Sequence, residues 1–175
     1  VLSVYAFDKD RAFVGTGGPQ SLMNTGSGHI WKTTDGGASW RPVLYGIDSR
    51  FGNMHFWNQD RGITVAQGVG DSSDVYITSD GGETWSHVPQ RLNARIPFYN
   101  TMQFIDGQYG WFASSNYYSS GDASVFRTVD GGVTWEEKSA GSDVDFVSDI
   151  AFVDPLKGWL VDDVAGRIRR TVSGG

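Results

Sequence analysis

Apolar residues recur at every second position in short runs along the chain. Between residues 102 and 137 such runs occupy Met102–Ile105, Trp111–Ser114, Val125–Thr128 and Thr134–Glu137. Gly, Asn, Asp and Ser separate the runs, as they do at turns. Alternation with a period of two predicts half-buried strands, and no segment sustains a helical period. We therefore expect an all-β chain built from short strands joined by tight turns.

One motif recurs along the chain and defines its organisation. It occupies Ile30–Trp40, Val75–Trp85 and Val125–Trp135, and each copy ends in Thr-x-Asp-Gly-Gly-x-Ser/Thr-Trp. A shortened fourth copy, Ile168–Gly175, has Ser173 at the position of the Asp. The three aspartates and Ser173 follow one another at steps of 45, 50 and 43 residues.

A second motif runs in the same order, once in each repeat. It begins with an apolar residue, has Asp or Asn four residues later, and then has Ala or Gly followed by an apolar residue. Its four copies begin 50, 48 and 48 residues apart, at Val4, Met54, Met102 and Ile150. Two motifs of matching period, with four strands in each unit, are typical of β-propeller blades. We predict one partial propeller domain, 1–175, with repeats at about 1–49, 50–97, 98–145 and 146–175.

The Asp-Gly-Gly segment predicts a hairpin turn between the third and fourth strands of each repeat. Gly accepts the positive φ that tight hairpins require, and the Asp carboxylate can accept bonds from N–H groups in the turn. The Trp returns on the outgoing strand, where we expect its ring to be buried between neighbouring sheets. At Ser173 a hydroxyl is expected to bind the turn less strongly than a carboxylate. A structural role is thus predicted for Asp35, Gly37, Trp40, Asp80, Gly82, Trp85, Asp130, Gly132 and Trp135.

The motif resembles the Asp-box, also called the bacterial neuraminidase repeat, of sialidases, sortilin-type receptors and several glycoside hydrolases. The element Phe-x-Asp-x-x-x-Gly-Trp, clearest at Phe104–Trp111 and Phe152–Trp159, resembles the repeat of photosystem II stability/assembly factor-like propellers. The resemblance covers essentially the whole chain and implies that the box lies away from the face used for chemistry. It also implies a larger ring of about six to eight blades, completed by further blades of the parent chain or by a second chain. A closed four-bladed ring is the alternative.

Charge and residue content narrow the possible partners. The chain has 14 Lys and Arg and 20 Asp and Glu, which give a net charge of −6. This charge argues against a nucleic-acid partner, because phosphate binding needs clustered positive charge. No run approaches the roughly 18 apolar residues of a spanning helix, so no membrane insertion is expected. The chain has no Cys, and its three histidines, His29, His55 and His87, are far apart in the sequence at no metal-type spacing. We therefore predict neither a metal site nor a cofactor.

In propellers, the loops joining strands 2 to 3 and 4 to 1 emerge on one face, where ligands usually bind. We assign the first set to 16–29, 67–74, 115–124 and 162–166, and the second set to 41–53, 87–101 and 138–149. Their lengths vary between repeats, as expected for adaptable loops on a fixed scaffold. Side chains there that could bind a ligand are Arg50, Arg91, Arg95, Tyr99, Tyr117, Tyr118 and Asp122, together with Asp48.

Two of these loop segments have a more specific pattern. The Tyr- and Ser-rich stretch 114–121 suits a polar or sugar-like ligand by stacking and hydrogen bonding, and a plain solvated loop is the alternative. Arg95-Ile96-Pro97 resembles the Arg-Ile-Pro motif of sialidases, whose Arg binds a substrate carboxylate. The sialidase motif opens the first blade, whereas here it precedes the third, after two Asp-boxes. This departure puts a sialidase role for Arg95 in doubt.

No repeat contains a catalytic constellation, so no catalytic residue is assigned. We predict a non-enzymatic propeller that acts as a binding or assembly scaffold for a protein or glycan. We expect it outside the cytoplasm, as a secreted, periplasmic or cell-surface protein, although the given residues include no signal segment. The first alternative is a secreted glycoside hydrolase of sialidase or related type. The second is a photosystem assembly factor, which the scattered Arg residues and the net charge of −6 disfavour.

Overall fold

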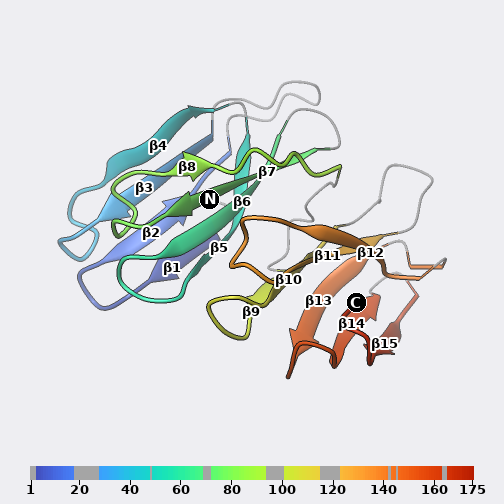
Figure 1. Ribbon diagram of the computed structural model, residues 1–175. Helices are drawn as coiled ribbons and strands as arrows, with labels where there is room; N and C mark the ends of the chain where they lie inside the picture. The colour runs from blue at the N-terminus through green and yellow to red at the C-terminus, as the bar shows by residue number, and fades with distance from the viewer. Residues whose placement is uncertain are drawn as a thin grey trace. The chain divides into compact units, whose positions relative to one another are not determined.

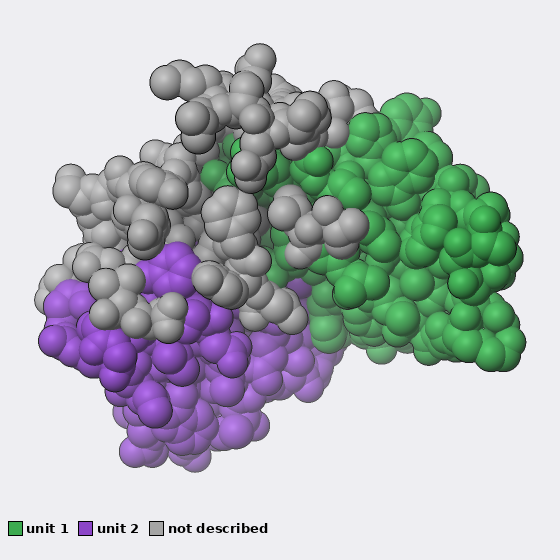
Figure 2. Space-filling view, turned by 180° about the vertical axis from the view of Figure 1, so that it is seen from behind, with its two compact units in different colours: residues 1–93 green, residues 94–175 purple. Residues whose placement is uncertain are grey.

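The computed structural model shows short antiparallel sheets (Figure 1). All regular elements in the described part of the chain are strands, and no helix there is long and apolar enough to cross a bilayer. The chain divides into two compact units, Val1–Asn93 and Ala94–Gly175, coloured green and purple in Figure 2. The structure describes residues 3–17, 28–47, 49–68, 72–93, 101–114, 123–141, 143–144, 146–162 and 165–175.

Unit 1 contains two four-stranded sheets, each with its strands in chain order and antiparallel. We call them blades 1 and 2. Blade 1 consists of β1 (Ser3–Ala6), β2 (Ala12–Gly15), β3 (Gly28–Thr33) and β4 (Arg41–Ile47). Blade 2 consists of β5 (Arg50–Phe56), β6 (Gly62–Gln67), β7 (Ser73–Thr78) and β8 (Ser86–His87).

Unit 2 contains a four-stranded sheet, blade 3, and a three-stranded sheet, blade 4. Blade 3 consists of β9 (Met102–Phe104), β10 (Gly110–Ala113), β11 (Ser124–Thr128) and β12 (Glu136–Ser139). Blade 4 consists of β13 (Val147–Phe152), β14 (Gly158–Asp162) and β15 (Arg167–Thr171). The all-β prediction is confirmed, and the strands of blade 3 begin within two residues of their predicted positions.

A side-chain turn joins the first two strands of every blade. Asp8 Oδ1 accepts hydrogen bonds from the N–H groups of Asp10 and Arg11, at 2.9 and 2.8 Å. The equivalent oxygens of Asn58, Asp106 and Asp154 accept the same two bonds in their own blades. An Asp or Asn side chain is suited to this turn because its oxygen reaches the backbone two residues later. This explains the Asp or Asn of the second sequence motif.

A phenylalanine ring lies against glycine at the same place in three blades. Phe104 pairs with Gly110 across β9 and β10, and Phe56–Gly62 and Phe152–Gly158 are equivalent pairs. A Cβ on Gly110 would lie 2.2 Å from the Phe104 ring. Blade 1 has Ala6 paired with Ala12 at this position. The small residue is therefore Gly where its partner is a ring and Ala where its partner is a methyl group.

The core of each unit lies between its two sheets. In unit 1, the Phe13 ring of β2 stacks on the Phe56 ring of β5 with centroids 4.9 Å apart. In unit 2, the Trp111 ring of β10 stacks on the Phe152 ring of β13 at 3.9 Å and an angle of 4°. Phe13 and Trp111 occupy equivalent repeat positions, as do Phe56 and Phe152. Each unit is thus a pair of propeller blades packed through the same two positions.

We predict that Gly110→Ala lowers the free energy of unfolding by about 1 to 3 kcal/mol, because the added methyl group overpacks against Phe104. Urea titration followed by circular dichroism measures this loss. Gly107→Ala is the matched control, since a Cβ there would meet nothing within 4 Å. The loss should be smaller in a Phe104→Ala background, which reproduces the Ala–Ala pair of blade 1. An equal loss in both backgrounds would contradict the ring-against-glycine explanation.

Candidate functional site

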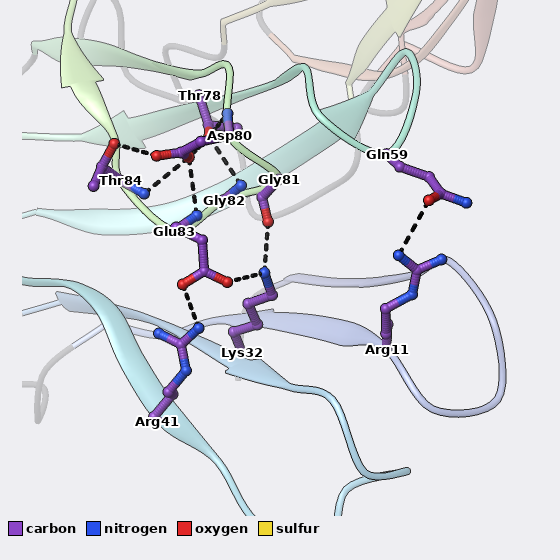
Figure 3. Close-up of polar contacts among 10 residues, drawn as sticks. All are labelled: Arg11, Lys32, Arg41, Gln59, Thr78, Asp80, Gly81, Gly82, Glu83 and Thr84. Atoms are coloured by element: carbon purple, nitrogen blue, oxygen red, sulfur yellow. Dashed lines mark hydrogen bonds and ion pairs between the residues drawn. The ribbon is translucent and has the colours of Figure 1, made fainter.

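The Asp-box of blade 2 is a closed network of hydrogen bonds around the carboxylate of Asp80 (Figure 3). Asp80 Oδ1 accepts bonds from the N–H groups of Glu83 and Thr84, both at 3.0 Å, and from the Thr78 hydroxyl at 2.8 Å. Asp80 Oδ2 accepts the Thr84 hydroxyl at 2.6 Å. The Thr78 hydroxyl in turn accepts the N–H of Gly82 at 2.9 Å. Both carboxylate oxygens are therefore engaged inside the turn.

The boxes of blades 1 and 3 repeat this geometry. Asp35 binds the N–H and hydroxyl of Ser39 at 2.9 and 2.6 Å, and Asp130 binds those of Thr134 at the same distances. The two glycines of each box have positive φ, which only glycine adopts without strain. Glycine is therefore required by the backbone conformation at three equivalent positions, Gly37, Gly82 and Gly132. The three aspartates hold the turns in place through their hydrogen bonds.

The hydrogen bonds of the box hold the pKa of its carboxylate low. The hydroxyl and N–H of Ser39 lower the pKa of Asp35 to about 2. At Asp80, partial burial raises the pKa, but the bonds from Thr84 and Thr78 outweigh it and bring the value to about 2. The pKa of Asp130 is lowered by equivalent bonds against a similar burial effect. These groups stay ionised at neutral pH and are unsuited to proton transfer.

The fourth copy of the box is weaker. Gly175 N–H donates to the Thr171 hydroxyl at 3.2 Å, compared with 2.9 Å for the same bond in the other boxes. Ser173 Oγ lies 3.3 Å from Thr171 Oγ1, compared with 2.8 Å between the Thr hydroxyl and the Asp carboxylate in the other boxes. A hydroxyl cannot accept the several bonds that a carboxylate accepts. The longer distances agree with the prediction made for Ser173.

The box turn of one blade also contacts the preceding blade within each unit. In unit 1, Lys32 Nζ of blade 1 donates to the Gly81 carbonyl of blade 2 at 2.7 Å and pairs with Glu83 at 2.5 Å (Figure 3). Arg41 also pairs with Glu83. In unit 2, the Trp111 indole N–H donates to the Gly174 carbonyl at 2.9 Å. The carbonyl of the first box glycine is thus the acceptor at both blade junctions.

The three box tryptophans differ in burial. Trp135 is 5% exposed and packs on the Phe112 and Phe104 rings, with centroids 4.9 and 6.1 Å away. Trp85 is half-buried against Phe56. The prediction of a buried ring is wrong for Trp40, which is 39% exposed. The reason is that blade 1 has the smaller side chains of Ala6 and Val14 at the positions of the two rings that cover Trp135.

Most predicted ligand-binding residues lie outside the described residues. These are Arg95, Tyr99, Tyr117, Tyr118 and Asp122, together with Asp48. Arg50 is half-buried at the start of β5, opposite Gln67. Arg91 lies after β8 and donates to Ser72 Oγ at 2.7 Å. The structure therefore places two of the candidates, both in blade 2.

Arg91 belongs to a group of polar residues that we call the blade 2 loop-end cluster: Ser72, Asp74, His87 and Arg91. His87 Nε2 lies 3.2 Å from Asp74 Oδ1, and the His87 ring packs on Tyr76 with centroids 5.2 Å apart. His87 is 45% exposed and Asp74 is 20% exposed. Burial, and next the nearby Asp74 charge, raise the pKa of Tyr76.

The backbone holds the loop-end cluster at the end of β7 opposite the Asp-box. Leu92 and Ser73 exchange two backbone hydrogen bonds, of 3.1 and 2.8 Å, which fix the segment that carries Arg91. Gly68 lets the Asp74 carboxylate and Ser72 hydroxyl approach, since a Cβ there would lie 2.8 and 3.0 Å from them. The cluster presents a carboxylate acceptor, an imidazole and a guanidinium donor, which suits recognition of a polar ligand.

The contact between Asp74 and His87 was not predicted from the sequence. The two residues lie 13 positions apart, and the strand register that brings them together depends on the length of the β7–β8 hairpin. The hairpin signal at Asp80 could have suggested it, because counting outward from the turn places both residues near the same end. No group of three or more potential ligands that could hold a metal ion occurs among the described residues.

We predict that Asp80→Asn lowers stability at pH 7, and that its deficit relative to the wild type shrinks as the pH falls. The folded pKa of Asp80, about 2, lies below the usual 3.8, so its contribution is complete above about pH 4 and is lost as the pH falls through 2. Urea unfolding at a series of pH values measures both proteins. Asp60→Asn, at an exposed position outside the box, is the control. A deficit that stays constant down to pH 2 would contradict the prediction.

We predict that Trp135→Ala lowers the free energy of unfolding by about 3 to 5 kcal/mol, because it empties a buried site between aromatic rings. Trp40→Ala should cost less than half as much, since its indole is already partly in water. Parallel thermal and urea unfolding of the two variants tests this order. Equal losses would mean that Trp40 is covered in solution by a surface outside unit 1.

The family described as BNR/Asp-box repeat matches residues 76–87, which is the box of blade 2. No curated protein matches the chain in sequence. Among solved structures, "YCF48 bound to D1 peptide" has a TM-score of 0.52 at 17% identity, covering 95% of this chain and 63% of that one.

Two glycoside hydrolase structures also resemble the chain. An ancestral GH74 enzyme has a TM-score of 0.65 at 17% identity, over 99% of this chain and 23% of the enzyme. The GH74 xyloglucanase from Xanthomonas campestris has a TM-score of 0.56 at 14% identity, over 94% and 26%. This chain thus spans less than two thirds of each of these proteins. At such identities the likeness concerns the fold. The chain carries an Asp-box repeat on blades with the fold of BNR-type β-propellers, as its sequence resemblance predicted.

Proposed function

We propose that this chain is a non-enzymatic β-propeller scaffold that binds a protein or glycan partner through the loops joining strands 2 to 3 and 4 to 1. One observation carries the proposal. The Asp-box carboxylates are saturated by bonds within their own turns, whereas the opposite end of blade 2 presents Asp74, His87 and Arg91. The residues available for recognition therefore lie at the loop end of the sheet.

The chemistry of the blade 2 loop-end cluster supports a binding role. Asp74 accepts hydrogen bonds, His87 donates or accepts according to its tautomer, and Arg91 donates a planar fork. The Tyr76 ring packs against the His87 imidazole, with centroids 5.2 Å apart. A rigid sheet carrying a few polar side chains at its loop end is a common arrangement for ligand recognition.

The similar structures support two kinds of partner. YCF48 is titled as bound to D1 peptide, which supports a peptide partner for the propeller fold. The GH74 proteins are titled as an enzyme and a xyloglucanase, which favours a glycan-related function as the alternative, a glycoside hydrolase. The partial coverage of these longer chains supports completion of the ring by further blades or by a second chain. An extracytoplasmic location remains part of the proposal.

Binding and turnover assays on the same protein test the proposal. The chain is screened against peptide and glycan arrays, and hits are titrated with Asp74→Ala, Arg91→Ala and the control Lys9→Ala. Lys9 is exposed in the turn between β1 and β2, at the Asp-box end of blade 1. We expect Asp74→Ala or Arg91→Ala to weaken binding at least about tenfold, as loss of a central polar contact does. Lys9→Ala should leave affinity unchanged.

Two outcomes would count against this function. Hydrolysis of a fluorogenic sialoside or a β-glucan by the wild-type chain would favour the glycoside hydrolase alternative. Loss of affinity in Lys9→Ala, with the loop-end variants unaffected, would move the binding surface to the Asp-box end. Circular dichroism of each variant separates loss of binding from loss of the fold.

A further inference from the structure

The chain contains four Asp-Gly dipeptides, and one of them differs from the others in its surroundings. Three are the box pairs that begin at Asp35, Asp80 and Asp130. The fourth, Asp106-Gly107, lies in the turn between β9 and β10. An Asp-Gly pair is chemically reactive, because glycine has no side chain to hinder attack of its backbone nitrogen on the carboxyl carbon of the preceding aspartate. The local structure of each pair decides whether this attack takes place.

The three box pairs are held away from this reaction. The N–H of the first glycine in each box donates to a backbone carbonyl in the turn between the first two strands of its own blade. These bonds, of 2.8 to 2.9 Å, join Gly36 to Asp10, Gly81 to Asp60 and Gly131 to Gln108. The low pKa of the box aspartates also keeps the protonated carboxyl group, which loses water most readily, scarce. Both reacting groups of a box pair are therefore held in place.

The Asp106-Gly107 pair lacks these restraints in the described part of the chain. The Gly107 N–H has no hydrogen-bond acceptor there, and a Cβ on Gly107 would meet nothing within 4 Å. Asp106 Oδ1 accepts the N–H groups of Gln108 and Tyr109 at 2.8 and 2.7 Å. Asp106 Oδ2 has no partner among the described residues. Both residues of the pair are exposed, so the carboxyl group and the glycine nitrogen lie side by side in contact with solvent.

The equivalent turns of the other three blades do not combine these features. Asp8 is followed by lysine, and its Oδ2 pairs with Arg11 at 2.8 Å. Asp154 precedes Pro155, whose nitrogen carries no hydrogen. Asn58 precedes a glutamine, whose side chain hinders attack by its backbone nitrogen. Blade 3 alone has an exposed aspartate with an unpaired second oxygen and a glycine after it, among the described turns of this type.

We propose that Asp106-Gly107 is a site of spontaneous isomerisation of aspartate to isoaspartate. The Gly107 nitrogen bonds to the side-chain carboxyl carbon of Asp106, and its proton leaves with the carboxyl hydroxyl group as water, which gives a five-membered succinimide. A water molecule then opens the ring. Its hydroxyl group bonds to the former main-chain carbonyl carbon, whose bond to the Gly107 nitrogen breaks, and its proton stays on that nitrogen. The chain then continues through the side chain of Asp106, with no net change in atoms.

The product changes the turn that supports the Asp-box of blade 3. The Cβ of Asp106 becomes a backbone atom, so the turn is longer by one methylene group. The Gln108 carbonyl, two residues later, accepts the N–H of Gly131 at 2.9 Å. Displacement of this carbonyl removes the bond between the turn and the box. Isomerisation is thus expected to loosen the Asp-box of blade 3 from the first turn of the same blade.

Ageing of the folded and the unfolded chain tests the proposal. The 175-residue chain is kept for several weeks at neutral pH, in buffer and in guanidinium chloride. Isoaspartate is detected by methylation with an isoaspartyl methyltransferase and located by peptide mapping with mass spectrometry. In buffer, we expect Asp106 to react at least about tenfold faster than Asp80, whose reaction must first break the hydrogen bonds of the box. In guanidinium chloride the four Asp-Gly pairs should react at similar rates.

Gly107→Ala is the matched variant, because its methyl group hinders the attack and meets no other atom within 4 Å. We expect isoaspartate at Asp106 to form at least about tenfold more slowly in this variant. Hydrogen exchange of the Gly131 amide, followed by NMR, should be faster in aged wild-type protein than in fresh protein. Aged Gly107→Ala should keep the exchange rate of the fresh protein. Circular dichroism verifies that the variant retains the fold.

Three results would overturn the proposed site. They are equal rates at Asp106 and Asp80 in the folded chain, a folded chain in which Asp106 is protected as strongly as Asp80, and an unchanged rate at Asp106 in Gly107→Ala. Unchanged exchange of the Gly131 amide in protein that carries the isoaspartate would contradict the expected loosening of the box.

Discussion

The structure depends on one local interaction, the carboxylate of the Asp-box binding the turn that joins the third and fourth strands. Asp80 accepts bonds from two N–H groups and two hydroxyls, so the backbone groups left unpaired at the turn are satisfied without water. Once the turn is closed, its first glycine offers its carbonyl to the preceding blade, where Lys32 or Trp111 donates to the equivalent carbonyl. The hairpin and the blade junction are thus built from the same few atoms.

The hydrogen bonds within the turn also give the Asp-box carboxylates a structural role. A carboxylate whose oxygens are engaged within a turn has a low pKa and little capacity for a ligand. This is why we place the proposed binding surface at the opposite end of the sheets, where strand lengths and loop sequences differ between repeats. In blade 2 that end carries Asp74 and His87, held 3.2 Å apart by strand pairing and supported by Tyr76.

Much of the fold could be predicted because its determinants are local. The period-two pattern, the Asp-Gly-Gly turns and the Asp or Asn of the second motif each act within a few residues, and the strands follow from them. The contacts within the candidate site were harder to predict. Arg91 was predicted to lie in a ligand loop, but its bond to Ser72 and the Asp74–His87 contact join residues on different strands. These contacts depend on the register in which the strands pair, and the residue types alone do not specify that register.

By itself, the sequence determined the all-β class, the order of four repeats and the chemistry of each turn, because these depend on neighbours along the chain. Only the tertiary structure decided which box tryptophan is covered, that Phe104 lies against Gly110, and that Asp74 lies beside His87. The physical reason is that burial depends on which surface packs against a residue. Trp40 and Trp135 have the same local sequence and differ in exposure because different surfaces face them.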